Sequence, residues 1–71
     1  MSHEIAAEIV ANVLTVVAEQ GAVLEAGDTI LILESMKMEI PVLAETSGTL
    51  VDLRVSVGDV VQEGDVLAVV S

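Results

Sequence analysis

Residues 21–28, Gly-Ala-Val-Leu-Glu-Ala-Gly-Asp, recur 37 positions later as residues 58–65, Gly-Asp-Val-Val-Gln-Glu-Gly-Asp. The match extends outward, because the same shift lays residues 5–34 over residues 42–71 with the apolar positions aligned. A solenoid needs three or more units to bury a core. Two copies therefore predict one quasi-two-fold domain that spans residues 1–71.

Each copy contains the pattern Gly-x-Val-x-x-x-Gly-Asp. The glycines suit turns that need a positive φ, and the Gly-Asp pair suits the start of the next strand. A phosphate-binding loop would need Gly-Lys-Ser/Thr, and a dinucleotide fingerprint would need three closely spaced glycines before a helix. Neither pattern is present, so the glycines are interpreted as turn residues.

The aliphatic residues around the repeat favour strands. The chain has 14 valines and 5 isoleucines, and β-branched side chains pack well on a pleated sheet. Short runs of such residues, separated by segments with Gly and Asp, predict strands in a sandwich or barrel. These runs are residues 13–17, 29–33, 50–55 and 66–70. Residues 4–11 fit either a helix or a strand.

Composition excludes several classes of function. Twelve acids against two bases give a formal charge of −10, and there is no aromatic residue on which a base could stack, so nucleic acid and anionic membranes are improbable partners. Without cysteine there is no thiolate and no Cys-based zinc site. The acids lack the spacing of a calcium loop, and we expect no metal. No signal peptide or membrane-length apolar run is present, which predicts a cytoplasmic protein.

The segment between the two copies, Ser35-Met36-Lys37-Met38-Glu39, breaks the rules for turns. The chain must reverse there between strands predicted at residues 29–34 and 38–43, yet the connection has no Gly, Asn or Asp. Two-residue hairpin turns usually need such residues because both central positions take a positive φ. A violation of this kind is often a functional position that the rest of the fold supports.

Lys37 is the only lysine of the chain, and it stands between Met36 and Met38. In one interpretation it is a solvated turn lysine between two methionines that fill the core. In the other, two exposed methionines form a polarisable surface for a partner, and the amine is a single acylation target. A Schiff-base lysine needs desolvation or nearby cations, whereas the neighbours of Lys37 are acids. His3, the sole histidine, lies in a terminus expected to fray, so no catalytic triad is expected.

The segment Glu34-Ser35-Met36-Lys37-Met38-Glu39 resembles the biotin attachment motif of the biotin carboxyl carrier family, usually Ala-Met-Lys-Met with an acid near each end. Residues 44–50 and 57–61 fit two further segments of that family, so the resemblance spans nearly the whole chain. It implies a flattened β-barrel of two four-stranded antiparallel sheets with pseudo-two-fold symmetry. The loop after Val17 is too short for the protruding thumb of some carriers, and Ser35 stands where the family usually has alanine.

The resemblance implies that Lys37 carries covalent biotin on an exposed hairpin and that a biotin protein ligase reads Met36 and Met38. It places Glu34, Ser35 and Glu39 at the flanks of the motif. The expected protein is a free-standing, monomeric, non-catalytic carrier that shuttles a carboxyl group between biotin carboxylase and carboxyltransferase. The alternatives are a lipoyl carrier, which usually has its lysine in an Asp-Lys-Ala setting, and an unmodified interaction module.

Overall fold

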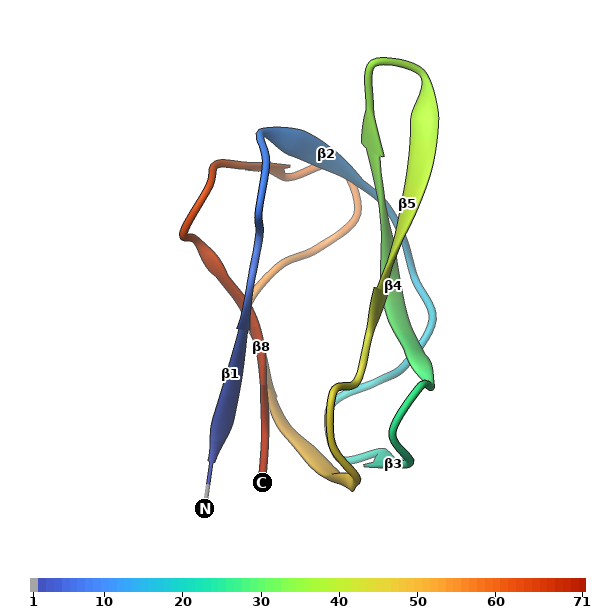
Figure 1. Ribbon diagram of the computed structural model, residues 1–71, viewed down its shortest axis with the longest axis vertical. Coiled ribbons are helices and arrows are strands. Elements are labelled where there is room, and N and C mark those ends of the chain that lie inside the picture. The colour runs from blue at the N-terminus through green and yellow to red at the C-terminus, as the bar shows by residue number, and fades with distance from the viewer. Residues whose placement is uncertain (1) are drawn as a thin grey trace.

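The computed structural model describes residues 2–71, and all regular secondary structure within this range is β-strand (Figure 1). The two sheets are antiparallel and four-stranded, as the resemblance implied. The strands are β1 (His3–Ala6), β2 (Ala11–Val16), β3 (Val23–Leu24), β4 (Thr29–Ser35), β5 (Met38–Leu43), β6 (Gly48–Leu53), β7 (Val60–Val61) and β8 (Val66–Val70).

The order of strands carries the symmetry of the sequence repeat. One sheet has the order β1-β8-β6-β3 and the other β5-β4-β2-β7, and the 37-residue shift converts the first order into the second. The register agrees as well, because Leu33 pairs with Ile40 in one sheet and Val70 with His3 in the other. The quasi-two-fold symmetry that the repeat predicts is therefore confirmed in strand order and register.

The Gly-Asp pairs of the repeat close tight turns. The Asp28 carboxylate accepts a hydrogen bond from the Glu25 N–H at 2.9 Å, and the Asp65 carboxylate accepts one from the Gln62 N–H at 2.9 Å. The glycines that precede these aspartates have φ of 95° and 92°, a conformation that side chains disfavour. The pattern is thus structural, since it fixes the turns that lead into β4 and β8.

The core lies between the two sheets and is built from both halves of the repeat. Its largest fully buried side chains are aliphatic, and no polar side chain is buried anywhere in residues 2–71. Burying one Val, Leu or Ile side chain contributes about 1.5–3 kcal/mol, so aliphatic packing can sustain this small fold. The fully buried side chains are Ile30, Leu31, Leu50, Leu67, Val13 and Val70.

Three details differ from the sequence prediction or refine it. The ambiguous residues 4–11 contain most of a strand, β1, and His3 does not fray because it pairs with Val70 of β8. The strands β3 and β7 have two residues each, too few to show an alternating pattern. The connection between β2 and β3, residues 17–22, holds no thumb. Across residues 2–71, the structure has no apolar helix of the length that a membrane requires.

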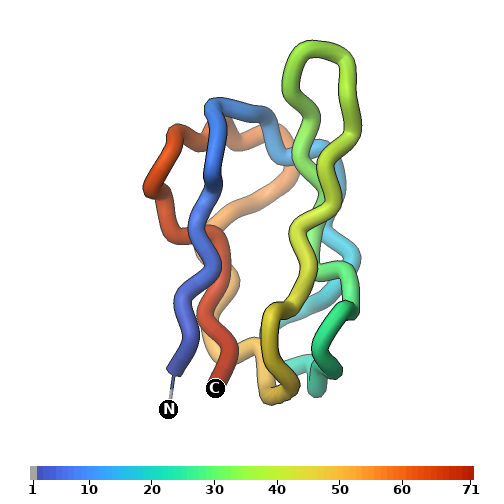
Figure 2. The backbone as a smooth tube through the Cα atoms, viewed as in Figure 1, coloured from blue at the N-terminus to red at the C-terminus, as the bar shows by residue number. Residues whose placement is uncertain are grey.

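The β4–β5 hairpin and the chain ends lie at opposite ends of the longest axis of the molecule (Figures 1 and 2). Its extent is 32 Å against 19 and 17 Å for the other axes, and the β4–β5 hairpin stands at one end of it (Figure 1). The two chain ends lie side by side at the opposite end, as the backbone trace shows (Figure 2). The fold therefore separates the hairpin that holds Lys37 from the termini.

Candidate functional site

The β4–β5 hairpin has a two-residue loop formed by Met36 and Lys37. Ser35 pairs with Met38 and Glu34 with Glu39, so the ladder continues to the residues that flank the loop. Met36 has φ 52° and Lys37 has φ 66°, and they are the only non-glycine residues with positive φ in the part of the chain described. Two positive φ values define a type I′ turn, which usually has Asn-Gly. The loop therefore has the ordinary backbone of a tight hairpin, but two residues that disfavour this conformation hold it.

The side chains at the tip face solvent. Met36 is 91% exposed and Met38 is 63% exposed, which excludes the interpretation that both methionines fill the core. Lys37 is exposed as well, and it takes part in none of the hydrogen bonds or ion pairs found among residues 2–71. An exposed amine without a partner is chemically available to an enzyme that acylates it.

The flanking residues of the motif lie at the base of the tip. Glu34 and Glu39 face each other across the hairpin, Glu34 half-buried and Glu39 exposed. Ser35 is half-buried, and its Oγ donates a hydrogen bond to the carbonyl oxygen of Val10 at 3.0 Å. All the predicted site residues thus lie on one hairpin. Nothing in the sequence indicated Val10, because its partnership with Ser35 depends on the placement of the loop between β1 and β2.

The remaining basic groups are occupied elsewhere. Arg54 Nε donates to the Asp52 carboxylate at 2.8 Å, and this hydrogen bond, together with the charge of Asp52, raises the pKa of Arg54 above its ordinary value. His3 Nε2 lies 3.0 Å from Glu45 Oε1 in an exposed pair. Within residues 2–71, no group of three or more acids and histidines is arranged to hold a metal ion.

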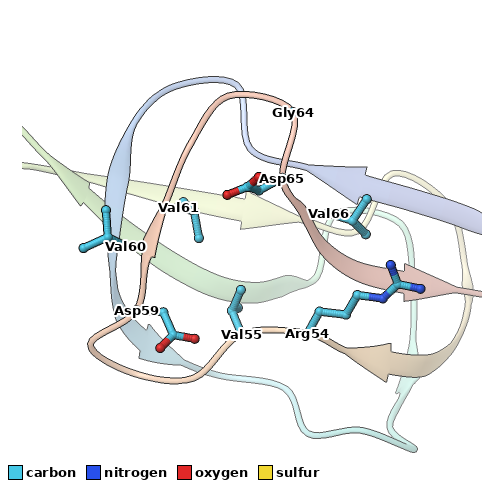
Figure 3. A pocket seen from close by; sticks show the side chains of 8 residues that line it. All are labelled: Arg54, Val55, Asp59, Val60, Val61, Gly64, Asp65 and Val66. Atoms are coloured by element: carbon cyan, nitrogen blue, oxygen red, sulfur yellow. The ribbon is translucent and has the colours of Figure 1, made fainter.

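A hollow of about 480 Å³ lies beside β7 and the start of β8 (Figure 3). Arg54, Asp59 and Asp65 are its charged residues, with valines between them (Figure 3). Asp59 accepts the Ser56 N–H at 2.8 Å, Asp65 closes its own turn, and Arg54 is paired with Asp52. These charged groups are already used by the fold, so the hollow offers no ready site.

A second hollow separates the edge strands β1 and β5. It is lined by apolar side chains such as Ile5, Leu33 and Ile40, with Glu8 and Glu45 at its acidic positions. It contains no basic residue and no nucleophilic side chain. The hairpin tip therefore holds the only lysine side chain of the described structure, and that amine is exposed and without a partner.

Comparisons with known proteins agree with this geometry. A family model described as "Biotin-requiring enzyme" matches residues 2–70. The chain is 54% identical over 71 residues to the "Biotinylated protein TB7.3 homolog" of Mycobacterium leprae, and the match covers 100% of both chains. The chain thus belongs to the family of biotin and lipoyl attachment domains.

Solved structures show the same fold in larger proteins. Urea carboxylase of Kluyveromyces lactis contains a segment that matches with a TM-score of 0.94 and 34% identity, covering 100% of this chain and 6% of that one. The lipoyl domain of the 2-oxoglutarate dehydrogenase complex from Azotobacter vinelandii matches with a TM-score of 0.78 at 23% identity, over 94% of this chain and 95% of that one. The second likeness shows the fold alone. The first is a likeness to a segment of a carboxylase, and together with the family match it supports a biotin carrier role.

Proposed function

We propose that Lys37 is joined to biotin through an amide bond and that the chain carries a carboxyl group between two enzymes. The single observation that supports this most is the tip itself, where the only lysine is exposed and unpartnered between two exposed methionines. Membership of the attachment family supports an acylated lysine, and the name of the M. leprae relative favours biotin over lipoate.

In the proposed attachment, Nζ of Lys37 attacks the activated carboxyl carbon of biotinyl-adenylate held by a biotin protein ligase. A C–N bond forms, the bond from that carbon to the phosphate oxygen breaks, AMP leaves, and Nζ loses protons to become an amide. The lysine charge disappears, so the formal charge of the chain falls from −10 to −11. The exposed turn fits this step because the amine can enter a partner's active site without disturbing the core.

Biotin supplies a ring nitrogen that can carry a carboxyl group, and the protein supplies presentation. We propose that biotin carboxylase and carboxyltransferase do the chemistry and that the carrier makes delivery effectively intramolecular. The strand that holds His3, the sole histidine, is β1, which lies away from the hairpin tip, so His3 is not placed to assist chemistry at Lys37 (Figure 1).

We also propose that residues 1–71 act as one cytoplasmic domain and that the isolated chain is a monomer. The charge of −10 makes two copies repel each other, which supports the monomer. Light scattering at near-physiological salt is expected to give the mass of one chain. A dimer mass that does not change on dilution would contradict this proposal.

Intact-mass analysis after co-expression with a biotin ligase tests the attachment. We expect one biotinyl increment in the parent chain and none in Lys37→Arg, a matched control that keeps the charge and length but cannot be acylated in this way. A lipoyl increment would show that the lipoyl alternative is correct. An unmodified mass would favour the interaction module.

The methionines allow a separate test of recognition. Met36→Ala and Met38→Ala remove exposed side chains, so we expect both variants to fold like the parent and to be biotinylated more slowly. The rate is measured by mass spectrometry against time with ligase limiting. Leu14→Ala, which trims an exposed aliphatic residue of β2, is the control and should keep the parent's rate. Parent rates in both methionine variants would contradict the proposed role.

A further inference from the structure

The β4–β5 hairpin extends beyond the rest of its sheet from Glu34 onward. The pairing of β4 with β2 reaches Asn12 and Glu34, and β4 continues beyond it only in partnership with β5. The tip accordingly projects past the other strands (Figures 1 and 2). A two-stranded ribbon without further support is marginally stable in water, so a contact with the barrel is needed to fix the direction of the hairpin.

The Ser35 side chain makes this contact. Ser35 lies one residue beyond the last backbone pair with β2, and its Oγ donates to the Val10 carbonyl oxygen at 3.0 Å. Within residues 2–71, no other hydrogen bond joins residues 35–38 to a segment outside the hairpin. The side chain therefore takes over where the backbone ladder stops.

The pair that corresponds to Glu34 and Asn12 in the other sheet is held by backbone bonds. In the other sheet, Ser71 exchanges backbone hydrogen bonds with Thr49 at 2.8 and 2.9 Å, and the 37-residue shift relates this pair to Glu34 and Asn12. Ser35 lies one residue beyond the position that corresponds to Ser71, and its hydroxyl bonds next to Met36 and Lys37, which hold a strained backbone.

We propose that Ser35 is a positioning residue for Lys37. Its bond to Val10 fixes the direction in which the hairpin leaves the barrel, so Lys37 reaches a modifying enzyme already ordered. A hairpin that is already ordered loses less conformational entropy when the enzyme binds it. The affinity for the enzyme therefore rises, while the bound complex itself stays the same. This proposal rests on the proposed attachment of biotin at Lys37.

The test compares Ser35→Ala, which deletes the donor, with Ser35→Thr, which keeps a hydroxyl. Because the family usually has alanine at this place, Ser35→Ala is expected to fold. Thr46→Ala is the matched control, since Thr46 is an exposed residue whose hydroxyl reaches only its neighbour Ser47, at 3.5 Å.

The first readout is amide hydrogen exchange of the unmodified chain, measured by NMR. One net hydrogen bond corresponds to a change of about two- to tenfold in an opening equilibrium. We expect Ser35→Ala to speed exchange at Met38 by this factor, with Leu50 and Leu67 in the core unchanged, and Ser35→Thr to restore it. Parent exchange at Met38 in Ser35→Ala would overturn the proposal, as would equal acceleration in Thr46→Ala.

The second readout is the ligation of biotin with purified ligase. We expect Ser35→Ala to raise KM by about two- to tenfold and to leave kcat within about twofold. The ligase must then order the hairpin when it binds, whereas the hairpin is equally ordered once it is bound. A KM equal to that of the parent would overturn the proposal. If the parent itself accepts no biotin, the proposed function fails, while the exchange measurement still decides whether Ser35 holds the hairpin.

Discussion

The strain in the lysine turn should be measurable as lost stability. Met36→Gly removes the Cβ that disfavours φ 52°, whereas Met36→Ala keeps it. Because the Met36 side chain is 91% exposed, both variants lose little packing, and their difference reports the backbone. A left-handed conformation costs a residue with a Cβ about 1–2 kcal/mol, and the greater freedom of glycine in the unfolded chain offsets about 0.5–1 kcal/mol of the gain.

We therefore expect Met36→Gly to be about 0.5–1 kcal/mol more stable than Met36→Ala, with the alanine variant within about 0.5 kcal/mol of the parent. For a chain of this size the difference corresponds to about 2–8 °C in Tm. The melts are followed by far-ultraviolet circular dichroism, since the chain has no aromatic residue to give a near-ultraviolet signal. Equal Tm values for the two variants would refute the claim that the turn is strained.

Three further predictions concern the fold. A Cβ built on Gly48 lies 2.8 Å from the Ser71 carbonyl oxygen, so Gly48→Ala should destabilise by about 1–3 kcal/mol, as urea unfolding would show; an unchanged midpoint would mean that the close approach is relaxed at no cost. Asp65→Ala removes the acceptor of the Gln62 N–H and should cost about 1 kcal/mol, whereas Asp65→Asn keeps an acceptor and should cost less; equal losses in thermal melts would contradict this account. Because His3 pairs with Val70, a short Gly-Ser linker can join Ser71 to Ser2, and new chain ends can be opened between Thr46 and Ser47. This circularly permuted chain should have the parent's circular dichroism spectrum, and an unfolded spectrum would contradict the prediction.

The sequence predicted the architecture because the repeat and the aliphatic runs act over long stretches. Strands were expected at residues 38–43 and 66–70, and β5 and β8 have these bounds. The absence of Gly, Asn and Asp around Lys37 indicated an unusual turn, which the positive φ of both loop residues confirms. Conformation at this site was predictable because turn chemistry is local.

Other features depend on contacts between distant segments, and local patterns do not carry them. The bond from Ser35 to Val10 joins residues 25 positions apart, and nothing at position 10 marks a carbonyl that will be used. His3 was expected to fray because it is near a terminus, yet the pairing of β1 with β8 holds it. The paired strands β3 and β7 are too short for periodicity to reveal.

If Lys37 carries biotin as proposed, the placement of both termini at the end opposite the hairpin would set how far that biotin reaches from an attachment point. A neighbouring domain or a surface joined to either end would hold the molecule by its base, and the 32 Å length of the barrel would add to the span of the linker and the lysine side chain. An enzyme that engages the tip would meet no such anchor. In that arrangement the barrel would act as a spacer as well as a scaffold, and its 32 Å long axis would contribute to the reach of the tip.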